Sequence, residues 1–497
     1  MKSKTLVRVL TLLLTVLMVF ALVSCGDSGK KPSGSDSGGT GTVEEGRKYP
    51  NLPDDTFYKD YNFTFVSSSP NWGGGAYIPE DVMADAYNGD TINDATYDRN
   101  QALKAKYGFN IVNVSSLNCA EAVRKAVRTG DSTYDAVIEA SMNISSLMFD
   151  NYLYNLYDLP NLDLSQEWWA QDSVQDLTFN NALYIVAGDM VKMSYCGSAV
   201  VYYNKTIAAE ENVEDLYQCV RDGKWTFDKL LEIAIACSKD LNGDQLIDFT
   251  NDRVGLSFGN KNHMAFFYGA GQKIATIRGD QIDLTMRTER TNDVAQWLAN
   301  VRARTDGVYV NDDSAPYADP AIHSFQQVRM NFMDNRVMFT IQTLNTASGE
   351  FAEMAEPGFG ILPIPKYNEQ QDEYYTFIPY DMHMLAVPNY VEDPARTGAI
   401  LEAICAYSKY TTKKAAYDDI LITRNTRSEE NEEMIDLIQK HRIFDLGYIF
   451  NWGDCRTLLL SSVERGTNTF QSTYASKQNR ISQEIQTTLE TIDSSKF

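Results

Sequence analysis

The sequence predicts an α/β protein, because strand-like and helix-like segments alternate along its first third. Three short apolar runs typical of strands lie at 61–66, 109–114 and 134–138. Helical patterns at 91–107 and 120–127 separate these runs, and each is followed by a glycine that can end a helix. This order predicts a parallel sheet with right-handed crossovers.

The alternation begins again beyond residue 180. Further strands are predicted at 182–187, 199–203, 337–341, 359–362 and 384–387. Further helices are predicted at 226–234, 294–301, 394–407, 428–441 and 471–492. Thr226 and Asp393 are suited to cap two of these helices, and Pro394 follows Asp393 at a first helical position. The sequence therefore predicts a second α/β region.

The N-terminus has the features of a secretion signal. Lys2, Lys4 and Arg8 precede an apolar run at 9–23, and Ser24 and Cys25 follow it. A transmembrane anchor is the alternative, but the run is shorter than the roughly 20 residues that a spanning helix needs. The segment LVSC at 22–25 resembles the lipobox of bacterial lipoproteins. That resemblance implies a signal peptide at 1–24 and a diacylated Cys25.

The next segment, 25–55, is predicted to be a flexible tether. Residues 26–46 are mostly Gly, Ser, Asp, Lys and Thr and cannot bury a core. A chain of this length typically reaches roughly 25 Å. We therefore expect a folded part that works at the extracellular face of the cell membrane, held there by lipid.

Composition excludes several functions. The net charge of −23 argues against binding nucleic acid, because phosphate recognition needs an excess of Lys and Arg. The four histidines are scattered, and the sequence has no HExxH, GxSxG, P-loop or GxGxxG motif. We expect no enzyme, although a glycosidase that works with carboxylates alone stays open.

The chain has seven cysteines. Without Cys25, six remain at irregular spacing and without a CxxC pair: Cys119, Cys196, Cys219, Cys237, Cys405 and Cys455. Export would permit disulfides. Cys237 and Cys405 lie within apolar helical patterns, so buried free thiols are the favoured interpretation, with the redox state left open.

Six short sequence motifs resemble motifs that occur in the same order in one known family. They are GDTIND with YDRN at 89–100, YDAV at 134–137, QEWW at 166–169, VVYYNK at 200–205, GKWTFD at 223–228 and FGILPIPK at 359–366. Their order behind a lipobox resembles that of the extracellular solute-binding proteins of ABC importers, in the maltose-binding-protein-like group (family 1). Together they span most of the chain beyond the tether.

This resemblance implies a two-lobed periplasmic-binding-protein-like fold with a hinge between the lobes. The chain would cross between lobes near residues 180, 375 and 412. One lobe would comprise 56–180 plus 376–412, and the other 181–375 plus 413–497. The chain is longer than small sugar-binding relatives, so its C-terminal topology stays open.

A solute cleft needs flat apolar faces and fixed hydrogen-bonding groups, and aromatic rings suit the C–H faces of sugars. Trp225 and Trp297 lie within helical patterns and are predicted to serve packing. Tryptophans in loops could instead line a cleft or cap a lobe. The predicted ligand-binding residues, which also include polar groups near strand ends and crossings, are Trp72, Trp169, Asp189, Tyr195, Asp381 and Trp452.

The segment 240–252 has the spacing of a calcium loop. Its candidate ligands are Asp240, Asn242, Asp244, the carbonyl of Leu246, Asp248 and Asp252. Two features depart from the pattern: Gln245 stands where glycine allows a sharp turn, and Asn251 stands where a bidentate Glu is usual. A structural Ca²⁺ and a solvated acidic turn both stay open, and no cofactor is expected to be required.

The leading functional hypothesis is capture of a solute, with an oligosaccharide as the first candidate, and delivery to ABC permease subunits. The protein would be a monomer attached to the membrane through its lipid. A lipid-anchored carbohydrate-active enzyme is the first alternative. A sensor lipoprotein that does not transport is the second, because a fold does not fix a function.

Overall fold

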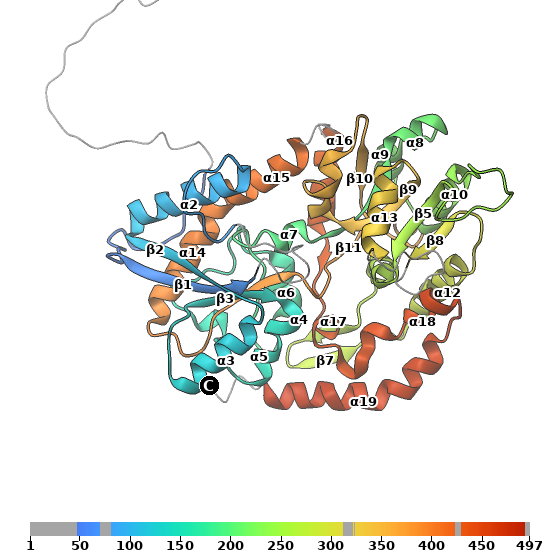
Figure 1. Ribbon diagram of the computed structural model, residues 1–497. Helices are drawn as coiled ribbons and strands as arrows, with labels where there is room; N and C mark the ends of the chain where they lie inside the picture. Colours follow the sequence, from blue (N-terminus) through green and yellow to red (C-terminus); the bar gives the residue numbers. More distant parts are fainter. Residues whose placement is uncertain (1–46, 70–80, 312–321, 323, 423–428, 493–497) are drawn as a thin grey trace, which may run out of the picture. The chain divides into compact units, whose positions relative to one another are not determined.

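The first sheet has the strand order β12-β3-β1-β2 in the computed structural model (Figure 1), which describes residues 47–69, 81–311, 322, 324–422 and 429–492. Its strands are β1 (Tyr61–Ser68), β2 (Phe109–Ser116), β3 (Ala136–Ala140) and β12 (His383–Ala386). β1 pairs in parallel with both β2 and β3, which confirms the predicted parallel sheet. β12 returns from far along the chain and pairs antiparallel with β3.

The helices between these strands begin and end at capping residues. Asp90 caps α2 (Thr91–Tyr107) by accepting two backbone N–H groups, and Gly108 ends it with a φ of 73°. Asn118 caps α3 (Cys119–Thr129) by accepting the backbone N–H of Glu121, and Gly130 ends it with a φ of 68°. Both helices extend over the predicted residues, because the sequence contains both the caps and the glycine stops.

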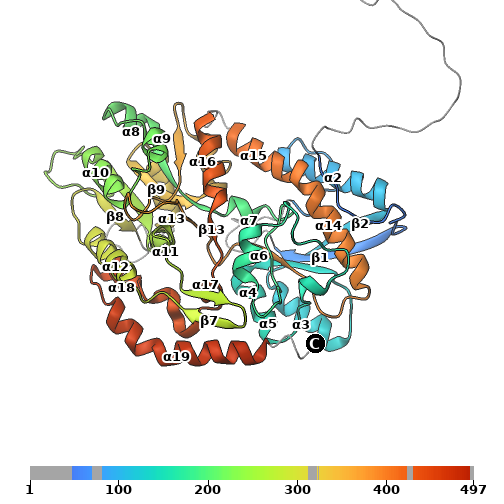
Figure 2. The same ribbon diagram turned by 180° about the vertical axis from the view of Figure 1, so that it is seen from behind.

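Two later helices complete this first half. α14 (Pro394–Tyr410) begins after its cap Asp393, and α15 (Thr412–Ile422) follows it directly. Both pack against α2, and Figures 1 and 2 show the orange pair beside the blue helix. We call the first sheet with α2, α3, α14 and α15 lobe I.

The second sheet has the order β10-β4-β9-β5-β8. Its strands are β4 (Ala199–Asn204), β5 (Val254–Gly259), β8 (Val308–Asn311), β9 (Val337–Thr343) and β10 (Phe359–Leu362). β5 pairs in parallel with β8 and β9, whereas β4 pairs antiparallel with β9 and β10. Every residue of β4 and β5 is buried, as expected for strands covered on both faces.

The second sheet and the helices that pack near it form what we call lobe II. These helices are α8 (Lys205–Glu210), α9 (Leu216–Arg221), α10 (Phe227–Cys237), α11 (His263–Gly269), α12 (Glu289–Arg302), α13 (Ser324–Met333) and α16 (Glu429–Lys440). Short 3₁₀ turns accompany them at η3 (Asn260–Asn262), η4 (Leu344–Thr346) and η5 (Glu350–Glu353). A hairpin of β6 (Ala275–Arg278) and β7 (Gln281–Leu284) precedes α12.

Shorter elements connect the sheets. After β3 come α4 (Ser141–Ile144), α5 (Ser146–Phe149), η2 (Leu156–Asp158), α6 (Gln171–Leu177) and α7 (Met193–Cys196). β11 (Thr376–Phe377) pairs with β13 (Arg442–Ile443). The C-terminal elements are α17 (Leu446–Phe450), η6 (Trp452–Thr457), α18 (Leu460–Arg465) and α19 (Phe470–Thr491).

One predicted strand is wrong. Residues 182–187 form no strand; Ala182 and Val186 take part only in isolated bridges, with Phe179 and Leu385. The segment is buried throughout. A short apolar run that is buried on all sides resembles a strand in sequence, because periodicity alone does not separate the two cases.

The strands of the first sheet fall within the predicted segments 56–180 and 376–412, and those of the second fall within 181–375. The exact lobe boundaries stay predictions. Trp225 is fully buried and its indole donates to the carbonyl of Pro363 at 2.9 Å, the packing role predicted for it.

The six cysteines beyond Cys25 are all buried with free thiols. Among the described residues, no helix combines the length and apolar composition needed to cross a bilayer. Cys25 and the tether up to residue 46 lie outside the described residues, so their predicted roles rest on the sequence.

Candidate functional site

A pocket of about 320 Å³ lies between helices α4 and α5, which follow strand β3 of lobe I, and the C-terminal elements α17 and η6. Its lining contains amides, hydroxyls, apolar side chains and one guanidinium: Met142, Asn143, Ser145, Ser146, Phe149, Ile449, Phe450, Asn451 and Arg456. We call it the α4–α17 pocket. Its first wall begins at the carboxyl end of a strand, where ligand sites of α/β sheets commonly form.

The crossing segment that precedes β12 holds the first wall in place. Ser141 donates its backbone N–H to the carbonyl of Met382 at 2.9 Å and its hydroxyl to the carbonyl of Tyr380 at 2.7 Å. Met142 donates its backbone N–H to the same Tyr380 carbonyl at 3.0 Å. The start of α4 is therefore fixed to the crossing segment rather than to its own helix, which is only one turn long.

Arg456 forms the charged part of the opposite wall. Its Nε donates to the carbonyl of Tyr448 at 2.6 Å, and its Nη2 donates to the carbonyl of Ile449 at 2.7 Å. Its guanidinium carbon lies 4.1 Å from the centre of the Tyr380 ring. These contacts fix a planar cation at the pocket, while Nη1 has no hydrogen-bond partner among the described residues.

A left-handed turn orients this wall. Asn451, Gly453 and Asp454 have φ values of 56°, 55° and 63°, and the side chain of Asn451 accepts the backbone N–H of Arg456 at 3.0 Å. A Cβ on Gly453 would lie 2.5 Å from Cγ1 of Ile481 on α19. Glycine is therefore required both by the backbone angle and by the close approach of α19.

Helix α19 holds the turn from outside the pocket. The indole of Trp452 donates to the hydroxyl of Thr488 at 2.8 Å, and Gly453 donates its N–H to Glu484 at 2.6 Å. Lys477 pairs with Asp454 at 2.9 Å. The turn of the second wall is therefore positioned by a helix that contributes no lining residue.

Aromatic rings approach the pocket from both walls. Phe149 on α5 and Phe450 on α17 meet edge to face with centroids 5.0 Å apart, and Phe450 stacks on Trp452 at 5.4 Å. Burial raises the pKa of Tyr380, and the nearby Arg456 only partly opposes this. The Tyr380 ring below the guanidinium therefore stays neutral near pH 7.

Two predicted ligand residues lie together elsewhere. Asp189 pairs with Lys413 of α15 at 2.7 Å, and the Lys413 ammonium lies 5.6 Å from the ring centre of Tyr195. Burial raises the pKa of the Asp189 carboxyl, while Lys413 partly opposes the rise. Neither residue lines the α4–α17 pocket; their contact with ligand stays a prediction.

The remaining predicted ligand residues have different surroundings. Trp169 is 1% exposed and its indole donates to Glu402 at 2.9 Å, and Trp452 is 2% exposed. In this conformation neither indole offers a face to a ligand. Asp381 is half-buried beside Tyr380, and Trp72 lies outside the described residues.

Sequence reasoning singled out the loop of the second wall, but through a residue that does not line the pocket. The segment 451–454 stood out through Trp452, whereas the lining comes from Asn451, Phe450 and Arg456. A mixed turn with successive left-handed residues has no regular period, so the sequence does not reveal which side chain points inward. Phe149 and Asn143 had no signal apart from their position after a predicted strand.

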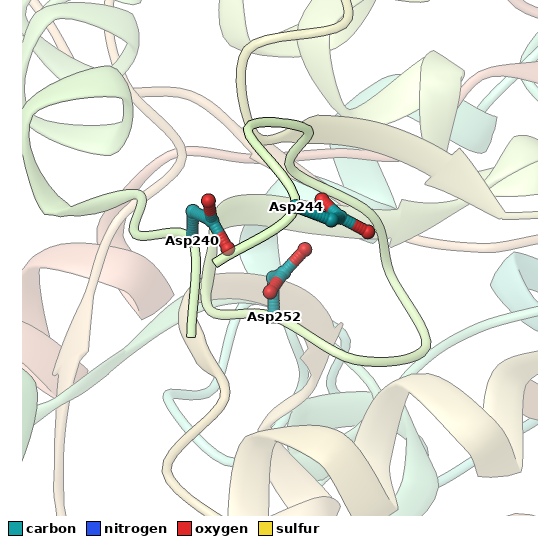
Figure 3. A group of neighbouring side chains, drawn as sticks. All are labelled: Asp240, Asp244 and Asp252. Atoms are coloured by element: carbon teal, nitrogen blue, oxygen red, sulfur yellow. The ribbon is translucent and has the colours of Figure 1, made fainter. Parts of the chain in front are cut away.

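Three carboxylates of the predicted calcium loop converge (Figure 3). Asp240, Asp244 and Asp252 each place an oxygen within 4.8 Å of the others. Gln245 adopts a φ of 69°, so the sharp turn forms without glycine. Asp252 is fully buried and accepts the backbone N–H groups of Leu241 and Asp248 at 2.9 and 2.8 Å.

The other three predicted ligands of this loop are arranged differently. Asn242 donates its amide to Asp244 at 3.0 Å, and the Leu246 side chain is exposed. Asp248 accepts the N–H groups of Thr250 and Asn251 and so closes a separate turn. The converging carboxylates fit a hard cation that takes oxygen ligands, but the donor set differs from the one predicted from spacing.

Comparison of the structure with solved structures finds many that share the fold. The maltose/maltodextrin-binding domain MalE from Bdellovibrio bacteriovorus, bound to maltotriose, matches with a TM-score of 0.52 and 12% identity over 86% of this chain and 100% of that one. An ABC substrate-binding protein from Listeria monocytogenes in complex with cycloalternan matches with a TM-score of 0.53 and 12% identity, over 86% and 100% of the two chains.

A third similar structure carries a different kind of ligand. UgpB from Mycobacterium tuberculosis in complex with glycerophosphocholine matches with a TM-score of 0.54 and 14% identity, over 86% of this chain and 98% of that one. No family model and no curated protein matches the sequence. At these identities the likeness concerns the fold, and it confirms the two-lobed α/β architecture that the sequence predicts.

Proposed function

Because this chain has the two-lobed fold of maltose-binding-protein-like solute-binding proteins, we propose that it binds a small polar solute and delivers it to the permease of an ABC importer. The single observation that supports this most is the α4–α17 pocket, in which Arg456 is fixed beside amides, hydroxyls and aromatic rings. Its volume lies at the lower end of the range typical of small-molecule sites, about 300–1,000 Å³.

The lining favours binding over glycoside hydrolysis. Glycosidases place two carboxyl groups across the scissile bond, and none of the described lining residues is an Asp, Glu or His. Amides and hydroxyls both donate and accept hydrogen bonds, as sugar hydroxyls require. An oligosaccharide is therefore the first candidate, and a phosphodiester that pairs with Arg456 is the second.

Calorimetry with maltotriose, cellotriose and glycerophosphocholine tests this proposal. We expect saturable binding of at least one probe without product formation, and a loss of affinity in Arg456→Ala. Arg278→Ala is the matched control, because Arg278 is exposed, pairs with Asp283 in the β6–β7 hairpin and does not line the pocket. Turnover of a bound sugar, or equal affinity in all three proteins, would contradict the proposal.

Uptake distinguishes an importer component from a sensor. Cells that carry the permease should accumulate the bound solute only when this protein is present. Binding in vitro with unchanged uptake after its deletion would favour the sensor.

We further propose that lipid on Cys25 retains the protein at the outer face of the membrane. A single acyl chain gives only marginal membrane binding, so a diacylated residue suits stable retention. Cys25→Ser should appear in the soluble fraction with unchanged ligand affinity, whereas Ser28→Ala in the tether should stay with the membrane. Membrane retention of mature Cys25→Ser would refute the anchor.

A structural Ca²⁺ at Asp240, Asp244 and Asp252 is also proposed. Three carboxylates this close repel one another, and a divalent cation would relieve that repulsion. The ion would stiffen the loop after α10 and would not contact the solute.

A further inference from the structure

A second pocket, of about 410 Å³, lies on lobe II and shares no lining residue with the α4–α17 pocket. Its lining residues are Phe227, Asp228, Asp293, Gln296, Trp297, Asn300, Tyr367 and Asn368. Four of them follow the 293, 296, 297, 300 spacing, which places them on one face of α12. The first turn of α10 and the segment after β10 supply the others. We call this the α12 pocket.

An aromatic surface forms one side of the α12 pocket. Trp297 packs against the core, the role predicted for it, and is also partly exposed. Its ring centre lies 4.9 Å from that of Phe227 and 4.7 Å from that of Phe266, both of which are buried. A rigid core layer therefore supports the exposed part of the indole, whose Nε1 has no acceptor among the described residues.

Polar groups with unused hydrogen-bonding capacity surround this surface. Tyr367 donates to one oxygen of Asp293 at 3.0 Å, and Gln296 donates to the carbonyl oxygen of Asn300 at 3.0 Å. No hydrogen bond within the described part of the chain engages the amide nitrogens of Asn300 and Asn368 or the carboxylate of Asp228. The pocket thus offers both donors and acceptors beside a flat ring.

We propose that the α12 pocket is a second carbohydrate-binding site, which takes one hexose unit of a glycan. The sugar would stack a C–H face near Trp297, donate hydroxyls to Asp228 and Asp293, and accept from the amides of Asn300 and Asn368. Binding here is independent of solute capture in the α4–α17 pocket, because the two pockets have separate walls.

An organic cation is the main competing ligand, because aromatic rings and carboxylates also suit cations. Two observations favour the sugar. The Arg290 guanidinium already lies 5.2 Å from the centre of the Tyr367 ring and would repel a second cation. The free amide nitrogens of Asn300 and Asn368 are donors, which a quaternary ammonium group cannot use.

Fluorine NMR of the full chain, labelled with 5-fluorotryptophan, tests the site directly. The six tryptophans give separate probes, and Trp297→Phe assigns the signal of interest. The ligands are linear trisaccharides of glucose, mannose and xylose, with choline chloride as the cation. We expect at least one trisaccharide to shift the Trp297 signal saturably. A shift with choline alone, or no shift with any trisaccharide, overturns the proposal.

Variants separate this site from the α4–α17 pocket. Asp228→Ala with Asn300→Ala should weaken the Trp297 response roughly tenfold or more, because each lost hydrogen bond contributes modestly. Gln486→Ala is the control, because it removes an exposed amide on α19. Gln486 pairs with Glu490 four residues later, as Gln296 pairs with Asn300 on α12. Arg456→Ala should leave the Trp297 response intact. Loss of that response in Arg456→Ala would mean that the signal reports on the other pocket and would overturn the proposal.

Discussion

The guanidinium of Arg456 lies over the ring of Tyr380, with its carbon 4.1 Å from the ring centre. Tyr380 belongs to the segment that crosses into lobe I before β12, and Arg456 follows the left-handed turn after α17. A cation–π contact therefore joins the crossing segment to the C-terminal wall of the α4–α17 pocket. Its strength depends on a planar cation, which distinguishes Arg from Lys at this position.

Arg456→Lys should therefore weaken solute binding although the charge is conserved. A lysine cannot bond the carbonyls of Tyr448 and Ile449 in the same fork, so the cation would lose its fixed position. We expect the free energy of unfolding to fall by about 1–3 kcal/mol as well. Calorimetry and urea unfolding measure the two effects. Native affinity in the lysine variant would show that geometry at this residue is unimportant.

Trp452→Ala should destabilise the protein, because the indole is buried and bonded to α19. Removing a buried tryptophan costs about 3–5 kcal/mol. Thr488→Val deletes the acceptor of the indole N–H, together with the hydroxyl's own bond to the Glu484 carbonyl, and should cost about 1 kcal/mol. Urea unfolding of both variants tests whether Trp452→Ala loses more stability than Thr488→Val. A stable Trp452→Ala protein with weakened binding would instead support a direct contact with ligand.

Lys413→Met should lower the free energy of unfolding more than the double variant Asp189→Asn with Lys413→Met does. The single change leaves the buried Asp189 carboxylate without its partner, which can cost several kcal/mol when a buried pair is broken. A double-mutant cycle in thermal unfolding gives the coupling free energy. Strict additivity of the two single changes would show that the pair contributes nothing.

Glu402 should make stability fall as the pH rises. Burial raises the pKa of this carboxyl from 4.5 to about 7, although the Trp169 indole and the Asp163 N–H partly oppose the rise. The folded state then holds the proton more tightly than the unfolded chain. Stability is fully retained below about pH 4.5 and declines by up to about 3 kcal/mol as the pH rises through 7.

Glu402→Gln isolates this contribution. The variant should gain stability relative to the native protein as the pH rises from 5 to 7.5. His383, whose pKa burial lowers to about 4, has the opposite pH dependence but is present in both proteins. Urea midpoints across this range provide the measurement, and a constant difference between the proteins would disprove the assignment.

Calcium should raise the melting temperature if the acidic loop binds it. We expect the rise in the native protein and its loss in Asp244→Asn, whereas Asp222→Asn, an exposed acid beside Lys224, should keep it. Scanning calorimetry with Ca²⁺ or with a chelator makes the comparison. Equal melting temperatures in both conditions would leave only an acidic turn.

The sequence predicted much of the fold because its local signals agree. Asp90 and Gly108 mark both ends of α2, and Asp393 with Pro394 marks the start of α14. The strand predicted at 182–187 is wrong, because a segment that is buried on all sides has the same continuous apolar sequence as a buried strand. The pairing of β12 with β3 joins distant segments, and no local pattern contains that information.

The pockets were harder to predict than the elements. Trp169 and Trp452 were selected for their residue type, yet their indoles bond to Glu402 and Thr488 inside the protein. Arg456 has no motif around it, and its position depends on backbone carbonyls and on Tyr380. Trp297 packs against the core as predicted, but its helical pattern did not reveal that it also lines the α12 pocket.

The position of α19 has a genetic consequence. The described residues that line the α4–α17 pocket are all encoded before residue 457, but the turn that orients Asn451 and Arg456 is held by Ile481, Glu484 and Thr488. A premature stop codon early in the α19 region would leave all these lining residues translated but would remove the support of the second wall. Screens for inactive alleles should therefore recover truncations here alongside missense changes at Gly453.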